Sequence, residues 1–275
     1  MRARIISFIV LSVIAMSCGS PGRPPISGGT HTVVVPAVPK HNNHLKSPIE
    51  VSQKCNRFHQ DNIEDIIEYS GFSVSYNKIG RIPNRVSYEL LASETDGPYS
   101  RKGKNFRQDP SLNLPQAEDN DYRNSGWSRG HMAPAGDFKW SDQAMSDTFY
   151  YTNCCPQNQS LNAGQWNTLE QRVRDWANRF GKVYVVTGPI IGKNIYGTIG
   201  DNRVVVPDSF FKAVLSSNQA IAFVMYNHNN NANLQKCAMS VDDLEALTGI
   251  DFFEELDDDF ENQVESTFNL RNWGL

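Results

Sequence analysis

The stretch Ser160–Lys182, "SLNAGQWNTLEQRVRDWANRFGK", carries the clearest secondary-structure signal in this chain of 275 residues. Gly181 stands near its end and is typical of a helix C-terminus. The apolar side chains recur at the spacing of one helix face: Trp166, Leu169, Val173, Trp176, Ala177 and Phe180. The stretch therefore predicts an amphipathic helix that packs one face against a hydrophobic core.

Asn162, at the beginning of this predicted helix, is an unusual residue for the face it occupies. At about 100° per residue, Asn162 falls near the centre of the apolar face, with Glu170 about 80° and Arg174 about 120° away from it. A buried amide needs hydrogen-bond partners. Asn162 can be the N-cap of the helix, or it can be a neutral oxygen ligand for a hard cation such as Mg²⁺. The pattern alone leaves both interpretations open.

Segments on both sides of this helix predict a sheet. Alternating or β-branched stretches predict strands at 72–76, 84–93, 182–191, 202–216 and 219–228. Further helices are predicted to begin at Asn62, after Ser141 and after Ser240, and serine is a good N-cap. Strand pairs with segregated helices, rather than a regular alternation of strand and helix, indicate the α+β class.

The N-terminus has the pattern of a secretory signal over residues 1–17. Arg2 and Arg4 precede an apolar run, Ile5–Met16, which is too short to span a bilayer. Small residues then lead to Cys18, as expected for a cleavage site. The pattern predicts an exported protein.

The mature chain is predicted to have two parts. Residues 18–52 are rich in Pro, Gly, Ser, His and Asn and predict a flexible linker. Residues 53–275 form the folded domain in this interpretation. Cleavage before Cys18 leaves an N-terminal cysteine, as in bacterial lipoproteins, so a lipid on Cys18 would attach the protein to a membrane. The expected locations are therefore the periplasm or outer membrane for a lipoprotein, or the medium for a simple secreted protein.

Charge is distributed unevenly along the chain. The whole sequence has a net charge of −4, but the stretch between Cys237 and Leu270 holds eleven acidic residues and no Lys or Arg. The remainder has 26 basic residues against 19 acidic ones, a net charge of +7. A local positive field would attract a phosphate backbone, whereas a solvated surface of mixed charge is the alternative. The basic residues concerned are Arg81, Arg85, Arg101, Lys102, Lys104, Arg107, Arg123, Arg129 and Lys139.

Four cysteines follow Cys18 in the sequence. They are Cys55, Cys154, Cys155 and Cys237. An exported protein can oxidise them, and four cysteines allow three pairings that the sequence does not separate. No CxxC pair is present, which argues against a zinc site.

The segment Gly126–Asp137, "GWSRGHMAPAGD", places His131 among glycine, alanine and proline residues that suit a tight turn. With an unperturbed pKa of about 6.5, a histidine can accept a proton from water at neutral pH. Taken alone, His131 is better explained as a structural residue than as a proton-transfer group.

Six blocks together identify a family resemblance. They are "SRGHMAPAGD", "TNCCPQ", "LNAGQWNTLE", "VVTGPI", "VVVPDSFFKAV" and "SVDDLEALTGIDFF". In this order they resemble the DNA/RNA non-specific endonucleases, the sugar-non-specific nucleases with a ββα-metal active site. The resemblance extends over about 69–256 and implies a central antiparallel sheet flanked by helices.

The resemblance implies a role for each matching residue. His131 corresponds to the general base that activates water, and Asn162 to the single protein ligand of the catalytic Mg²⁺, which Mn²⁺ can replace. Asn153 corresponds to an asparagine that holds either the histidine region or the phosphate. Glu170 corresponds to a carboxylate that holds water around the ion. The arginines that correspond to phosphate-binding residues are Arg129 and Arg174.

The activity implied is hydrolysis of phosphodiester bonds in DNA and RNA to give 5′-phosphate ends. Contacts to phosphate and sugar carry no sequence information, so low specificity is expected. Homodimers occur in the family, but no stretch here indicates an interface. Ser128 stands where the commonest family motif has Asp, which leaves metal preference and pH dependence open. A catalytically inactive nucleic-acid-binding protein and a phosphodiesterase for small diesters are the alternatives.

Overall fold

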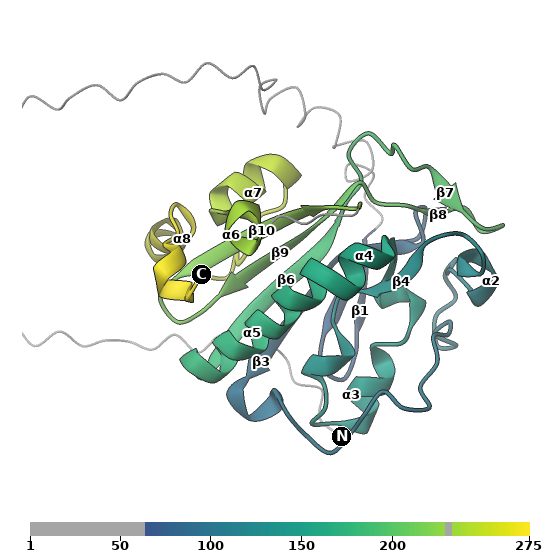
Figure 1. The fold of residues 1–275 in the computed structure, drawn as a ribbon, viewed down its shortest axis with the longest axis horizontal. Helices are drawn as coiled ribbons and strands as arrows, with labels where there is room; N and C mark the ends of the chain where they lie inside the picture. The colour runs from purple at the N-terminus through teal and green to yellow at the C-terminus, as the bar shows by residue number, and fades with distance from the viewer. Residues whose placement is uncertain (1–63, 229–232) are drawn as a thin grey trace, which may run out of the picture. The chain divides into compact units, whose positions relative to one another are not determined.

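A seven-stranded antiparallel sheet organises the chain, with strand order β1-β2-β3-β6-β9-β10-β11 (Figure 1). The computed structural model describes residues 64–228 and 233–275. The strands are β1 (Glu64–Glu68), β2 (Ser73–Asn77), β3 (Ile82–Leu91), β6 (Lys182–Ile190), β9 (Ser209–Leu215), β10 (Ala220–Tyr226) and β11 (Ala238–Met239). The predicted signal at 1–17, the linker at 18–52 and both Cys18 and Cys55 lie outside the described residues.

The predicted strands are mostly confirmed, with one correction to a strand and one to a helix. Residues 202–216 form two strands rather than one, because Pro207 interrupts β8 (Val204–Val205) and β9. The helix predicted to begin at Asn62 is wrong over its described part, since residues 64–68 form β1. Ile66 is exposed and Ile67 buried there, the alternation of an edge strand. Pairing with β2 decides the conformation of this short segment.

Both faces of the sheet are buried along β6, β9 and β10. Val185 and Val214 contribute to one hydrophobic cluster, whereas their neighbours Val186 and Ala213 pack in a second cluster. Because successive side chains in a strand point to opposite faces, the two clusters lie on opposite sides of the sheet. The α+β class and the antiparallel central sheet are therefore confirmed.

Different helices cover the two faces. α5 (Asn167–Phe180) buries Leu169, Val173 and Trp176 in the first cluster. α7 (Val241–Thr248), capped by Ser240 as predicted, and α8 (Asp258–Glu265) pack their apolar residues in the second. The shorter helices are α2 (Asp119–Tyr122), α3 (Asp142–Asp147), α4 (Gln159–Leu161), α6 (Leu234–Cys237), η1 (Ala92–Glu94), η2 (Ala135–Asp137), η3 (Tyr151–Asn153) and η5 (Leu270–Trp273).

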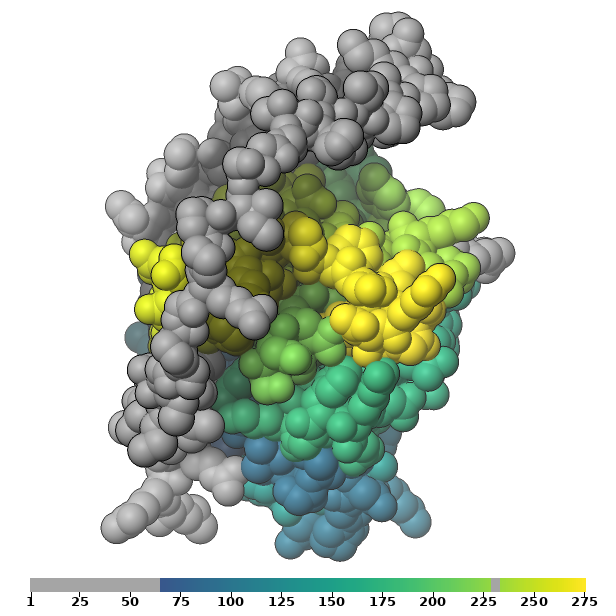
Figure 2. Space-filling view, turned by 90° about the vertical axis from the view of Figure 1, so that its left-hand side faces the viewer, coloured from purple at the N-terminus to yellow at the C-terminus, as the bar shows by residue number. Residues whose placement is uncertain are grey.

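The C-terminal residues return to α5. The indole of Trp273 meets Trp176 edge-on at a centroid distance of 4.9 Å, and the Trp176 Nε1 atom donates to the Trp273 carbonyl at 2.8 Å. Figure 2 shows the yellow C-terminal atoms lying against the teal surface of this region. The last residues thus fasten α5 to the domain.

Outside the central sheet, β4 (Ser128–His131) pairs with β5 (Cys154–Gln157), and β7 (Thr198–Ile199) pairs with β8. Cys154, Cys155 and Cys237 are buried free thiols, so no disulfide links these three. Within the described part of the chain, no helix combines the length and hydropathy that a membrane crossing requires.

Candidate active site

The β4–β5 pair places Arg129 and His131 on one face of a short ribbon. Because side chains alternate along a strand, residues two positions apart point the same way. A Cβ atom on Gly130, between them, would collide with the side chain of Gln157 on β5. Glycine at this position therefore allows the two strands to approach and fixes the Arg-Gly-His arrangement.

His131 lies in an aromatic setting that keeps its imidazole neutral. Its ring centroid is 4.8 Å from that of Phe106 and 5.1 Å from that of Phe149. Burial lowers the pKa of His131 to about 3, and the nearby charge of Arg101 acts in the same direction. The Nε2 atom is shielded from solvent and has no hydrogen-bond partner. An unpaired neutral nitrogen is able to accept a proton.

Asn153 holds the chain that follows His131. It is fully buried, and its Oδ1 atom accepts from the Ala133 amide at 2.8 Å. Its Nδ2 atom donates to the carbonyls of Ala133 and Thr148, both at 2.9 Å. All of its side-chain groups are thus engaged with backbone. Of the two expected roles, this geometry supports holding the histidine region and leaves no group for a phosphate.

The predicted helix is interrupted beside Asn162. Between α4 and α5 the chain forms η4 (Asn162–Trp166), a π-helical turn in which Gly164 has φ −102° and ψ −107°. The N-cap lies earlier, at Asn158, whose side chain accepts from the amides of Ser160 and Leu161. The N-cap interpretation of Asn162 is therefore wrong.

The π-turn also changes which side chains share a face. The π-turn holds one residue more than an α-helical turn. The angle about the helix axis between the side chains of Asn162 and Glu170 therefore changes from about 80° to about −20°. For Arg174 the angle shrinks from about 120° to about 20°. Asn162, Glu170 and Arg174 accordingly line one pocket. The regular helix assumed from the sequence placed Asn162 with the core and Glu170 and Arg174 to one side, which was wrong.

One cavity, the first pocket, brings most of the predicted residues together. It has a volume of about 540 Å³ and lies where β4, the turn after it and the η4–α5 helix meet. Five of the six predicted site residues line it: Arg129, His131, Asn162, Glu170 and Arg174. Asn153 lies behind the pocket rather than in its wall.

Arg129 is held at the mouth of the first pocket by an acidic partner. Its Nη2 atom lies 2.6 Å from Asp119 Oδ1, and its guanidinium stands 5.2 Å from the ring centroid of Tyr122. Asp119 is itself largely exposed. The arginine therefore keeps a fixed position next to solvent, where an anion can share it.

Arg174 connects α5 to the turn after His131. Its Nη1 atom lies 2.6 Å from Asp137 Oδ1, and the hydroxyl of Tyr88 donates to Asp137 Oδ2 at 2.8 Å. Asp137 has no solvent exposure, and this burial raises its pKa despite the guanidinium. The ion pair therefore joins the two halves of the pocket by linking β4 and its turn to the helix.

A buried lysine on the central sheet acts electrostatically on Glu170. Lys212, on β9, is fully buried, and its ammonium stands 4.8 Å above the ring of Trp166. Removal from water raises the pKa of Glu170 to about 7, an effect that the positive charge of Lys212 opposes. Burial in turn lowers the pKa of Lys212 to about 8. Glu170 and Lys212 thus favour each other's charged form electrostatically, although the Lys212 Nζ atom has no hydrogen-bond partner among the described residues.

A second pocket of about 750 Å³ shares Arg101 and Arg129 with the first. Trp127, Lys104 and Ser128 contribute to its walls. The hydroxyl of Ser128 donates to the Gln159 side chain. Ser128 lines this second pocket and not the first, so its replacement of the usual Asp alters the surroundings of His131 only indirectly.

Sequence reasoning missed several contributors to the site. Arg101 and Lys139 line the first pocket and had been noticed only for their charge. Asn167 also lines it, yet nothing distinguishes this residue from an ordinary helix amide. Asp137 and Lys212 are part of the family motifs quoted above, "SRGHMAPAGD" and "VVVPDSFFKAV", but neither was predicted as a site residue. The one available signal for Lys212 was a charge in the middle of an apolar strand, "SFFKAVL".

The side chains in the first pocket suit a hard divalent cation. Asn162 and Asn167 offer amide oxygens, and Glu170 offers a carboxylate. Mg²⁺ prefers oxygen ligands, is bound by few protein groups and retains several waters. Mn²⁺ accepts the same donors. The oxygen donors present therefore fit Mg²⁺ or Mn²⁺.

Comparisons with known proteins show which family the chain is similar to. Residues 54–259 match the family model described as DNA/RNA non-specific endonuclease. The chain is 41% identical over 207 residues to the mitochondrial nuclease EXOG of Danio rerio, which covers 68% of this chain and 60% of that protein. It is 39% identical over 137 residues to human mitochondrial endonuclease G, with 46% of each chain covered.

A solved structure is similar as well. A chain in the crystal structure of the EndoG/EndoGI complex aligns with a TM-score of 0.67 and 28% identity, covering 81% of this chain and 96% of that one. Human mitochondrial EXOG is 37% identical over 211 residues. The chain spans only 57–60% of the length of the zebrafish and human EXOG proteins.

Proposed function

The chain belongs to the DNA/RNA non-specific endonuclease family, and from this premise we propose that it hydrolyses phosphodiester bonds in DNA and RNA to leave 5′-phosphate ends. One observation carries the proposal. The unpaired Nε2 atom of His131 belongs to the same pocket as Asn162 and Glu170, which are contributed by a separate element. A base and a set of oxygen donors thus lie together beside cationic groups.

His131 is the proposed general base. Its lowered pKa keeps the imidazole unprotonated at neutral pH, so Nε2 is free to take a proton from an attacking water molecule. A bound phosphodiester brings a negative charge close to the ring. That charge raises the pKa of His131 toward the range in which a base is most effective.

Asn162 is the proposed ligand of the Mg²⁺ ion, with Glu170 as an acceptor for water near it. When bound, a divalent cation supplies Lewis-acid stabilisation of the negative charge on the phosphoryl oxygens. The pKa of Glu170 falls in the presence of a cation, so this carboxylate is ionised in the active protein.

The arginines and the second pocket support a polymeric substrate. Arg129 stands between the two pockets, and Arg101 lines both. A guanidinium can bind a phosphate through two parallel hydrogen bonds. Contacts of this kind recognise the backbone rather than the base edges, which supports cleavage without sequence specificity.

Digestion of plasmid DNA and of RNA with Mg²⁺ tests the proposal. His131→Ala removes the base, and we expect a loss of about 10²–10⁴-fold in rate. Asn162→Ala should cause a loss that excess Mg²⁺ or Mn²⁺ partly restores. His228→Ala, an exposed histidine outside both pockets, is the matched control. Rates that are equal in wild type and in both pocket variants would refute the proposed mechanism.

We also propose export, which the pattern of residues 1–17 supports. Whether the mature protein carries a lipid on Cys18 or is simply secreted is decided by the mass of its N-terminal peptide. A lipid adduct on Cys18 supports membrane attachment, and an unmodified N-terminus at Cys18 supports secretion. Retention of Met1 in the cellular protein would contradict both.

A further inference from the structure

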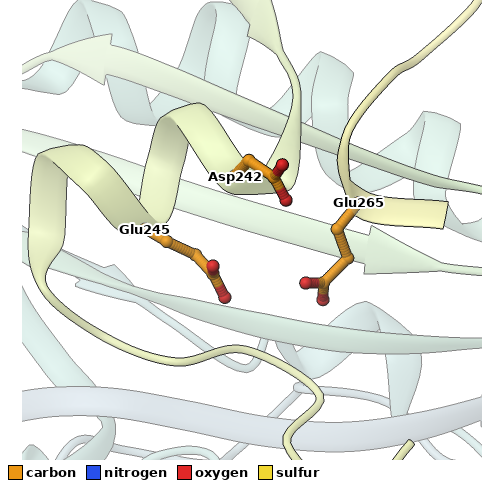
Figure 3. A group of neighbouring side chains, drawn as sticks. All are labelled: Asp242, Glu245 and Glu265. Carbon is orange, nitrogen blue, oxygen red and sulfur yellow. The ribbon is translucent and has the colours of Figure 1, made fainter. Parts of the chain in front are cut away.

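A group of carboxylates lies in the C-terminal part of the chain, on the face of the sheet opposite α5. Asp242 and Glu245 lie one turn apart on α7, and Glu265 is the last residue of α8. One oxygen from each of the three lies within 4.8 Å of the other two. Figure 3 shows the three side chains converging from these two helices.

Glu265 distinguishes this group from an ordinary acidic surface. The residue is only 3% exposed, and its Oε1 atom has no hydrogen-bond partner. Its carboxylate points toward that of Glu245 (Figure 3). A buried carboxylate oxygen without a partner is costly unless a proton or a cation satisfies it.

No basic residue close in sequence is available to pair with the Glu265 carboxylate. The chain has no Lys or Arg between Cys237 and Leu270. Burial raises the pKa of Glu265 to about 8, and the charges that raise it further belong to other acids, Glu245 foremost. Glu261, also on α8, contributes another buried carboxylate oxygen without a hydrogen-bond partner, its Oε1 atom.

The positions of the carboxylates are fixed by the fold. Glu245 Oε1 accepts from the Phe252 amide at 2.8 Å, so this side chain is held in place. Val241, Leu244 and Val264 anchor the two helices in the second hydrophobic cluster. The group is therefore built into packed helices rather than into a loose loop.

We propose that Asp242, Glu245 and Glu265 bind a Ca²⁺ ion that joins α7 to α8. Calcium–oxygen distances of about 2.4 Å allow two ligands of one ion to lie up to about 4.8 Å apart, which matches the spacing of these oxygens. Ca²⁺ accepts several carboxylates in irregular geometry, whereas Mg²⁺ is usually held by one or two. The exposed side of Asp242 leaves room for water ligands.

Thermal unfolding of the full chain, stripped with EDTA and then titrated with CaCl₂, tests this site. Ligand at a hundredfold excess over its dissociation constant should raise the Tm of a domain of this size by roughly 5–10 °C. We expect the shift in wild type and in Asn162→Ala, since that variant affects only the first pocket. It should be lost in Glu265→Gln and reduced in Asp242→Asn.

Glu255→Gln, an exposed acid outside the group, is the matched control and should keep the full shift. Without calcium, Glu265→Gln should melt at or above the wild-type temperature, because the amide is uncharged. If that variant does not fold, the exposed Asp242→Asn decides instead. The proposal is overturned by a full shift in Asp242→Asn, or by a shift that Asn162→Ala loses and Glu265→Gln keeps. It is also overturned if wild type shows no shift up to about 10 mM, above the weakest protein calcium sites.

Discussion

Carboxylates are buried on both sides of the central sheet, but among the described residues their electrostatic surroundings differ: Arg174 and Lys212 act on those at the first pocket, whereas burial and other acids act on Glu265. At the first pocket, Arg174 is paired with the buried Asp137, and the positive charge of Lys212 favours the ionised form of Glu170. On the opposite side, no Lys or Arg lies in the stretch that carries Glu245 and Glu265. A site that balances its own charge is ready for an anionic substrate, whereas one that does not needs an external cation.

The largest expected effect is on the free energy of unfolding, when the buried ion pair at the first pocket is broken. Arg174→Met leaves Asp137 buried without its cation, and we expect it to lower the free energy of unfolding by about 3–5 kcal/mol. Urea denaturation measures this. Arg172→Met on the same helix is the control, because Arg172 forms only an exposed pair with Asp175 at 3.5 Å, of a kind that contributes less than about 1 kcal/mol.

A double variant separates charge from packing in this prediction. Asp137→Asn combined with Arg174→Met should recover part of the lost stability, because no unpaired charge then remains. Similar losses of unfolding free energy in Arg172→Met and Arg174→Met would mean that the buried pair contributes no more to stability than the exposed pair.

Removing a charge from the carboxylate group on α7 and α8 should have the opposite effect and stabilise the protein in the absence of calcium. The folded protein raises the pKa of Glu265 from 4.5 to about 8, so the folded state keeps a proton that the unfolded state loses. Stability without calcium should therefore fall as pH rises from about 4.5 to 8. Glu265→Gln should remove about 2–3 kcal/mol of this loss by pH 7. Denaturation in EDTA across this range measures it, and a slope unchanged from wild type would contradict it.

His131 should give the first pocket the reverse pH dependence. Its pKa falls from 6.5 in the unfolded chain to about 3 in the folded one, so the unfolded state binds more protons in between. Stability should fall as pH decreases through this range, by about 2 kcal/mol at pH 5. His131→Gln should flatten the acid limb of the stability profile. His228→Gln is the control and should leave that limb intact.

The smallest expected effect is on the cleavage rate, when an acid is added to the second pocket. Ser128→Asp places a carboxylate in the second pocket, where Ser128 contacts Gln159 rather than His131. A substitution of this kind typically changes free energies by no more than about 0.5 kcal/mol, so the cleavage rate should change by about threefold or less. A change of a hundredfold would show that position 128 controls the base directly.

The sequence predicted the parts of the molecule that depend on local pattern. The strand over 72–76 followed from alternation, that over 84–93 from β-branched and aromatic content, and the helix ending at Gly181 from spacing. His131 and Arg129 were found because a short motif carries them. Their shared face required only that the motif be a strand, which β4 is.

Features that depend on distant contacts were not predictable. Residues 64–68 were predicted to be helical, but pairing with β2 makes them a strand. Lys212 is a charge within an apolar strand, and nothing in the sequence predicts that it acts electrostatically on Glu170. The alignment of Asn162 with Glu170 depends on the π-turn, and helix periodicity assumes that no such turn is present.

The π-turn has a consequence for how this region tolerates insertions and deletions. It already contains the equivalent of one inserted residue, and the backbone of Gly164 lies outside the helical range. Removing Gly164 would leave a regular helix with the flanking side chains in nearly the same phase. Removing one residue between Asn167 and Glu170 would instead rotate Asn162 by about 100° away from Glu170 and Arg174. A library of single-residue deletions should therefore retain folded members with an assembled pocket at 163–165, but not within the following turn.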